Sequence, residues 1–158
     1  MALAKKRIQK ELEKFNLEEP EGFTAGPIDD SDLFKWHATV AGPEDSPYEG
    51  GIFELSIEFH QDFPYKPPRL CILTKIFHPN LNYYSGTICC CALDFLKNSW
   101  DPSITVLEML IAFQNLLINP NIEKVCGLGN DEAAKLYKED INTYKIKAKE
   151  WTEKYAKD

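Results

Sequence analysis

Three adjacent cysteines, Cys89, Cys90 and Cys91, follow a His-Pro-Asn turn and a glycine in HPNLNYYSGTICCCALDFLKNSW, residues 78–100. A cysteine thiolate is a nucleophile that can carry an acyl group, provided that it lies on an accessible segment. Neighbouring side chains of an extended segment point in opposite directions, so at least one of the three thiols should face outward. The pattern predicts a reactive cysteine here.

The other common uses of cysteine are not supported by the spacing. The chain has five cysteines and three histidines, without matched CxxC pairs or histidines at zinc-binding spacing. Three contiguous thiols would strain a tetrahedral site, so we predict no metal ion. Cys71, within RLCILT, is predicted to be a small buried hydrophobic residue.

Size and charge limit the class of protein. A chain of 158 residues is long enough to form one domain. Its net charge of −7 argues against nucleic acid or an anionic membrane as a partner. No apolar run approaches the length of a membrane span, and no secretory signal is recognised, so a cytoplasmic or nuclear location is expected.

The N-terminal half predicts a helix followed by strands. Residues 2–16 carry apolar side chains at helical spacing beside one basic face. The apolar positions are Leu3, Ile8, Leu12 and Phe15. Residues 33–40 and 52–59 alternate apolar and polar side chains, which predicts strands with one buried face, and residues 69–74 predict a short third strand. FPYKPP, residues 63–68, can form neither a helix nor a central strand, because proline lacks the N–H donor.

The C-terminal half predicts helices after a long irregular segment. Residues 79–102 show no sustained period, which is typical of a functional loop. A helix should begin after Thr105, which can form a capping box with Glu108, and Asn130 should cap the first of two further helices. The order of elements predicts an α+β fold with an antiparallel meander sheet and segregated helices.

Eight short motifs in order resemble the ubiquitin-conjugating enzyme family. They are KKRIQKEL, TAGP, GPEDSPYEGGIFELSIEF, FPYKPP, KIFHPN, GTIC, LDFLKNSWDP and KEWTEKYA. The resemblance implies one catalytic domain over residues 1–158, with an N-terminal helix, a four-stranded antiparallel sheet, a long active-site segment and C-terminal helices. It also implies that a cysteine accepts ubiquitin from the activating enzyme as a thioester, and passes it to a lysine amine or to a ligase. No cofactor is implied for this chain, because ATP is used by the activating enzyme.

The resemblance gives two answers for the reactive cysteine. GTIC, residues 86–89, matches the family motif in which the cysteine follows an aliphatic residue. Counted back from LDFLKNSW, however, the cysteine should stand at the position of Ala92. We favour Cys89, because the local motif fits it, with Cys91 as the second candidate and Cys90 as the third.

Other residues of the site are also assigned by resemblance. Asn80 is expected to stabilise the oxyanion of the transition state or to structure the loop, and these two roles are compatible. His78 is expected to hold the turn through hydrogen bonds rather than to act as a base. Glu123 and Asp94 are the acidic candidates near the site, and neither is assigned as a catalytic base.

The resemblance further implies surfaces for ubiquitin, the activating enzyme, ligases of the RING or HECT type and protein substrates. The matching residues are Lys6, Arg7 and Lys10 for the activating enzyme, Tyr65, Pro102 and Ser103 for the two ligase-binding loops, and Thr24 for a second ubiquitin. Two alternatives stay open. One is a catalytically impaired variant that binds ubiquitin or a partner without forming a thioester, and the other is a carrier for a ubiquitin-like modifier.

Overall fold

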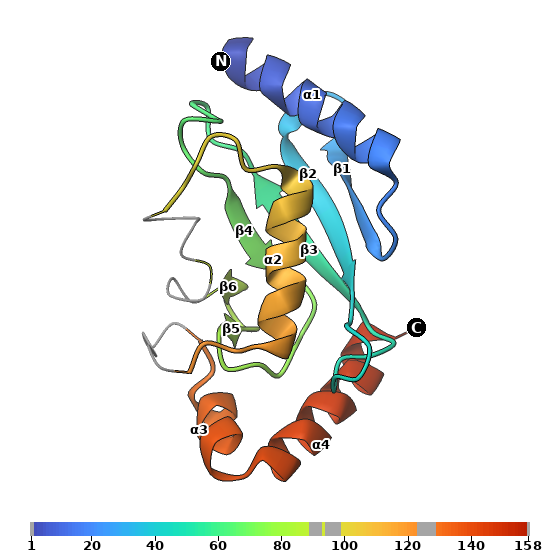
Figure 1. Ribbon diagram of the computed structural model, residues 1–158, viewed down its shortest axis with the longest axis vertical. Coiled ribbons are helices and arrows are strands. Elements are labelled where there is room, and N and C mark those ends of the chain that lie inside the picture. Colours follow the sequence, from blue (N-terminus) through green and yellow to red (C-terminus); the bar gives the residue numbers. More distant parts are fainter. Residues whose placement is uncertain (1, 89–92, 94–98, 123–128, 158) are drawn as a thin grey trace.

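A computed structural model of the chain describes residues 2–88, 93, 99–122 and 129–157 (Figure 1). The elements in chain order are α1 (Ala2–Glu18), β1 (Phe23–Asp29), β2 (Asp32–Ala41), β3 (Ile52–Glu58), β4 (Arg69–Ile72), β5 (Leu81–Asn82), β6 (Thr87–Ile88), α2 (Val106–Ile118), α3 (Asp131–Glu139), α4 (Ile141–Trp151) and the π-helical turn η2 (Thr152–Ala156). The predicted α+β fold, with its N-terminal helix, meander sheet and C-terminal helices, is confirmed. Within the described ranges, no helix is long and apolar enough to cross a membrane.

The main sheet has the order β1-β2-β3-β4, and every neighbouring pair is antiparallel. Alternate side chains of the two central strands are buried and pair across the sheet, as Trp36 with Ile57 and Val40 with Phe53 show. The alternation in the sequence therefore predicted β2 and β3 correctly. It did not reveal β1, where no side chain is fully buried and Gly26 and Pro27 interrupt the pattern.

Helix α1 packs against β1, β2 and α2, and α2 crosses the sheet in front of β3 (Figure 1). The buried face of α1 consists of Ala4, Ile8, Glu11 and Phe15. The prediction was wrong for Leu3, whose side chain is 70% exposed. Residues 4, 8, 11 and 15 lie on one face at helical spacing, and Leu3 is turned away from that face by one residue.

The segment after residue 79 contains two short strands that the sequence did not predict. Leu81 pairs with Ile88, and Asn82 pairs with Thr87, so β5 and β6 form a small antiparallel hairpin. Two-residue strands are too short to produce a periodic pattern in the sequence. The chain that leads to the adjacent cysteines is therefore anchored by a hairpin, rather than irregular from residue 79 onward.

Both predicted helix caps are present. The Thr105 hydroxyl accepts a hydrogen bond from the Glu108 N–H at 3.2 Å, which caps α2. The Asn130 side-chain oxygen accepts from the Ala133 N–H at 3.1 Å, which caps α3. These caps fix where each helix begins, and α2 in turn begins beside the loop that joins it to the candidate active site.

Candidate active site

His78 connects the turn before the hairpin to helix α2. Its Nδ1 accepts a hydrogen bond from the Asn80 N–H at 3.0 Å, and its Nε2 lies 2.7 Å from the Leu116 carbonyl oxygen. Since Nδ1 accepts, the proton is on Nε2, which donates to Leu116. The side chain is fully buried, and this burial lowers the pKa of His78 to about 4. His78 is thus neutral and makes the hydrogen bonds that were predicted for it.

Asn80 holds the turn against the loop that follows α2. Its Nδ2 donates to the Asn121 carbonyl oxygen at 2.8 Å, and its Oδ1 accepts from the Asn121 N–H at 2.8 Å. The side chain is only 2% exposed. Both ends of the amide are therefore engaged by one backbone unit, which supports the loop-structuring role.

The turn also contacts the residues that lead into α3. The Asn130 N–H donates to the Pro79 carbonyl oxygen at 3.0 Å. A Cβ at Gly129 would lie 2.2 Å from the same oxygen, so no larger residue fits there without a shift of the backbone. The start of α3 and the His-Pro-Asn turn consequently form one packed unit.

Gly86 attaches the hairpin to the edge of the main sheet. It has a φ of +75°, which favours glycine, and its carbonyl oxygen accepts from the Ile72 N–H of β4 at 2.9 Å. A Cβ at this position would lie 2.8 Å from the Ile72 carbonyl oxygen. Gly86 thereby fixes Thr87 and Ile88, the two residues that precede the cysteines in the sequence.

Several sequence predictions fall on residues outside the described part of the chain. These are the three thiols Cys89, Cys90 and Cys91 and the acidic candidates Asp94 and Glu123. Of the residues before them in the chain, the structure joins His78 to Asn80 by a hydrogen bond and Gly86 to β4. In the described ranges, no group of His, Cys, Asp and Glu side chains is placed to hold a metal ion.

Cys71 differs from its prediction as a buried hydrophobic residue. Its side chain is half-buried and carries a free thiol. Leu70 and Ile72 on either side of it are buried, so the alternation of β4 directs Cys71 to the opposite face of the strand. It lies beside Gly86, where an added Cβ would be 3.6 Å from the Cys71 Cβ.

The residues predicted to meet the activating enzyme and the ligase lie close together. A hollow of about 260 Å³ is lined by Leu3, Lys6, Arg7, Lys10, Pro64 and Tyr65. Tyr65 is 71% exposed, and Pro102 and Ser103 are exposed as well. The two loops are joined by Trp100, whose indole N–H donates to the Pro64 carbonyl oxygen at 2.7 Å. Leu3 belongs to this surface and was not predicted there, because it was grouped with the apolar residues at helical spacing in the first helix.

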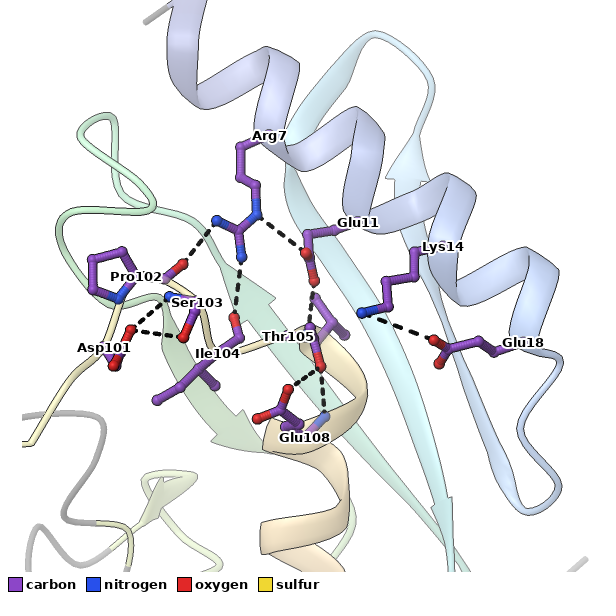
Figure 2. Close-up of polar contacts among 11 residues, drawn as sticks. Arg7, Glu11, Lys14, Glu18, Asp101, Pro102, Ser103, Ile104, Thr105 and Glu108 are labelled. Atoms are coloured by element: carbon purple, nitrogen blue, oxygen red, sulfur yellow. Dashed lines mark hydrogen bonds and ion pairs between the residues drawn. The ribbon is translucent and has the colours of Figure 1, made fainter.

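The Arg7 side chain is partly buried and makes hydrogen bonds to other residues of the protein, whereas Lys6 and Lys10 are exposed. Figure 2 shows the Arg7 guanidinium directed from α1 toward the loop that carries Pro102. It donates to the carbonyl oxygens of Pro102 at 2.7 Å and of Ile104 at 3.4 Å. Its side chain is only 23% exposed. Arg7 thus joins α1 to the loop predicted from the sequence to bind a ligase.

Glu11 completes this connection and was not singled out from the sequence. One carboxylate oxygen accepts from the Arg7 Nε at 3.1 Å, and the other accepts from the Val106 N–H at 2.8 Å (Figure 2). Val106 is the first residue of α2, where a negative charge also interacts favourably with the helix dipole. The signal that could have identified Glu11 is a carboxylate four residues after an arginine, on the buried face of a helix.

The loop between Trp100 and α2 is held in shape by Asp101. Its carboxylate accepts from both the N–H and the hydroxyl of Ser103, each at 2.8 Å. These two hydrogen bonds lower the pKa of Asp101. Pro102 and Ser103 are therefore presented on a turn of fixed geometry.

Thr24 lies on the exposed face of the sheet. It pairs with Thr39 of β2, and the two hydroxyl oxygens are 2.5 Å apart. The imidazole of His37 lies 3.5 Å from the Glu54 carboxylate in the neighbouring strands. This face is polar, in contrast to the buried face that packs on the helices.

Comparison with known proteins identifies the class. The sequence model of the ubiquitin-conjugating enzyme family matches residues 7–152. The E2 domain of a ubiquitin-conjugating enzyme from Toxoplasma gondii has a similar structure, with a TM-score of 0.85 and 36% sequence identity over 97% of this chain and 99% of that chain. The protein belongs to the ubiquitin-conjugating enzymes. Membership implies ubiquitin, activating enzymes and ligases as its general classes of partner.

Proposed function

We propose that this chain carries ubiquitin as a thioester on Cys89 and transfers it to a lysine amine or to a ligase. In the loading step, the Cys89 thiolate attacks the thioester carbonyl on the activating enzyme, and the thiolate of that enzyme leaves. In the transfer step, an amine attacks the new thioester and releases the Cys89 thiolate. The motif GTIC and the family membership support this assignment.

The observation that carries the proposal is the anchored hairpin before the cysteines. Leu81 and Asn82 pair with Ile88 and Thr87, and Gly86 is bonded to β4. Position 89 follows directly on this fixed strand, so it is the first thiol after the anchored part of the chain. This favours Cys89 over Cys91 as the nucleophile.

The loading step needs only a small fraction of thiolate, whereas the attack by lysine needs groups that stabilise the transition state. A cysteine of ordinary pKa, about 8.5, is a few per cent thiolate at neutral pH. That fraction is sufficient for transfer of the acyl group from one thiol to another, because the thioester bond broken and the thioester bond formed have similar energies. Attack by lysine is harder, and a fixed amide donor beside the oxyanion would stabilise its transition state by about 3 kcal/mol. An amide nitrogen has two N–H groups, so Asn80 can hold Asn121 with one and meet the oxyanion with the other.

The partner surfaces are proposed on the same basis. Lys6, Arg7 and Lys10 would meet the activating enzyme, and the exposed Tyr65 with the Pro102–Ser103 turn would meet a RING or HECT ligase. An aromatic and a proline beside a hollow are suited to anchor a partner loop. Thr24 would lie within a site for a second, non-covalent ubiquitin.

A charging assay tests the proposal. The protein is incubated with activating enzyme, ATP and ubiquitin, and the products are separated on a non-reducing gel. We expect a band heavier by one ubiquitin that dithiothreitol removes. Cys89→Ala should abolish this band, whereas Cys90→Ala and Cys91→Ala should retain it. Loss in Cys91→Ala alone would move the nucleophile to Cys91.

The same assay separates the alternatives. If the intact protein never forms a reducible band with any modifier, it is a catalytically impaired member that only binds ubiquitin or a partner. If the band forms with a ubiquitin-like modifier and its own activating enzyme but not with ubiquitin, the chain carries that modifier. A reducible band that persists when all three adjacent thiols are alanine would refute the proposed nucleophile.

A further inference from the structure

A hollow that the proposed reaction does not use lies beside the β5–β6 hairpin. It has a volume of about 260 Å³ and lies between the turn of the hairpin, the start of α3 and the end of α4. We call it the acidic aromatic pocket, and its lining residues are Asn82, Tyr83, Tyr84, Gly129, Asn130, Asp131, Glu132 and Trp151. Its composition, three aromatic rings and two carboxylates, is that of a site for a cation.

The aromatic wall is built by Tyr83, Tyr84 and Trp151. The rings of Tyr83 and Tyr84 have centroids 3.9 Å apart, and Tyr83 meets the Trp151 ring edge to face at 4.7 Å. Tyr84 is 84% exposed, so a large aromatic face remains open to a ligand. A hydrogen bond with Tyr84 raises the pKa of Tyr83 to about 12, so the Tyr83 hydroxyl keeps its proton at physiological pH.

The carboxylates of Asp131 and Glu132 are both exposed at the rim of the pocket. Glu132 already accepts a hydrogen bond from Lys147 through one oxygen. Asp131 makes no ion pair with any residue in the described parts of the chain. The two carboxylates with one lysine leave a net negative charge, which matches a positively charged ligand.

The pocket lies close to the position proposed to carry ubiquitin. Asn82 lines it and pairs with Thr87, and paired Cα atoms are about 5 Å apart. Cys89 is two residues further along the chain, a distance of at most about 7 Å. The Cα atom of Asn82, at the edge of the pocket, is therefore within roughly 12 Å of the Cα atom of the reacting position, which is at most about three to four residues of an extended peptide.

We infer that the acidic aromatic pocket binds a basic side chain of the acceptor protein, an arginine or a lysine that lies two to four residues from the lysine to be modified. The inference rests on the proposed function and deepens it, since it assigns a preference for the acceptor sequence. A guanidinium suits the site best, because it stacks on aromatic faces and donates to carboxylates with one flat group.

The test is a single-turnover discharge of the ubiquitin-charged protein to short peptides at concentrations below saturation. Each peptide has one lysine and, three residues away, either arginine or citrulline, which has a similar shape but no charge. We expect the arginine peptide to react about fivefold faster than the citrulline peptide. Equal rates for the two peptides would overturn the inference.

Substitutions in the pocket test whether the preference for the arginine peptide depends on the residues that line it. Asp131→Asn combined with Glu132→Gln, and separately Tyr84→Ala, should reduce the ratio of the two rates to near one. Glu139→Gln is the matched control, because it removes an exposed carboxylate from the far end of the same helix. An arginine preference that persists in both pocket variants would assign it to another surface and refute the pocket.

A binding measurement separates this inference from the proposed function. The uncharged protein is titrated with each peptide, and the indole N–H signal of Trp151 is followed by NMR, with Trp151→Phe used to assign it. We expect a shift with the arginine peptide that is absent with citrulline and in the double carboxylate variant. If the protein fails to form a thioester but this shift is seen, the proposed reaction fails and the pocket stands. If charging succeeds and the shift is absent, the pocket alone is refuted.

Discussion

The Arg7 guanidinium lies 2.7 Å from the carbonyl oxygen of Pro102, a residue 95 positions later in the chain. The same group bonds Glu11, whose carboxylate also receives the first N–H of α2. One cation therefore holds the helix proposed to meet the activating enzyme against the loop proposed to meet the ligase. A substitution of Arg7 by alanine therefore removes contacts within the fold as well as a charge proposed to meet a partner.

We predict that Arg7→Ala and Lys10→Ala will differ in stability. Arg7→Ala removes hydrogen bonds to two carbonyl oxygens and leaves the buried Glu11 carboxylate without its cation, so the free energy of unfolding should fall by about 2 kcal/mol. Lys10 is exposed, so Lys10→Ala should change the free energy of unfolding by less than about 0.5 kcal/mol. Urea denaturation measures both. Equal stabilities of the two variants would show that the contacts of Arg7 contribute nothing.

The contacts of Arg7 could not be predicted from the sequence alone. The basic face of the first helix was correctly predicted, but three basic residues on one face look alike in the sequence. Only Arg7 comes close to the carbonyl oxygens of Pro102 and Ile104, which lie far from it in the sequence and near it in the fold. Leu3 is the converse case, since a leucine at nearly the right spacing lies on an exposed surface.

Strands could be predicted from the sequence where one face of the strand is buried, because only then do apolar and polar residues alternate. Strands β2 and β3 have one face buried, and their sequences alternate accordingly. Strand β1 lacks buried side chains, and β5 and β6, with two residues each, are too short to produce a periodic pattern. The motifs of the site were evident from the sequence, whereas the pairing of Asn80 with Asn121 required the structure.

His78 should make stability depend on pH. Burial lowers its pKa from 6.5 to about 4 in the folded state, so between these values the unfolded state binds more protons than the folded state. Stability therefore falls as the pH is lowered from 7 to 4, by about 3 kcal/mol from this group alone. Unfolding by urea at several pH values should show a smaller loss in His78→Gln than in the parent. His60→Gln, at an exposed histidine, should retain the loss of the parent.

Asn80→Ala should separate the structural role of Asn80 from its catalytic role. The variant loses two hydrogen bonds to the Asn121 backbone, which should lower the free energy of unfolding by about 2 kcal/mol. If Asn80 also meets the oxyanion, discharge to free lysine should slow by roughly a hundredfold while charging is much less affected. Thermal unfolding and single-turnover discharge, measured on the same preparation below its melting temperature, report the two roles. A slower discharge without a loss of stability would contradict the structural role.

The last prediction concerns the glycine that anchors the active-site hairpin. At Gly86 a methyl group meets a positive φ of 75° and a carbonyl oxygen at 2.8 Å, so Gly86→Ala must shift either the hairpin or the edge of β4. Gly26 offers a matched control, because a Cβ there would lie 3.9 Å from the Leu12 Cδ1, an ordinary contact. We expect Gly86→Ala to lower the free energy of unfolding by about 2 kcal/mol and Gly26→Ala to change it by less than about 0.5 kcal/mol.

The consequence for function follows from the position of Gly86 three residues before the proposed nucleophile. A displaced hairpin would misplace the thiol relative to Asn80, so Gly86→Ala should form the ubiquitin thioester more slowly even where it is fully folded. The measurement is the initial rate of charging at a temperature at which denaturation curves show both glycine variants to be native. If Gly86→Ala charges at the rate of Gly26→Ala, the hairpin does not position the nucleophile, and the preference for Cys89 over Cys91 loses its structural support.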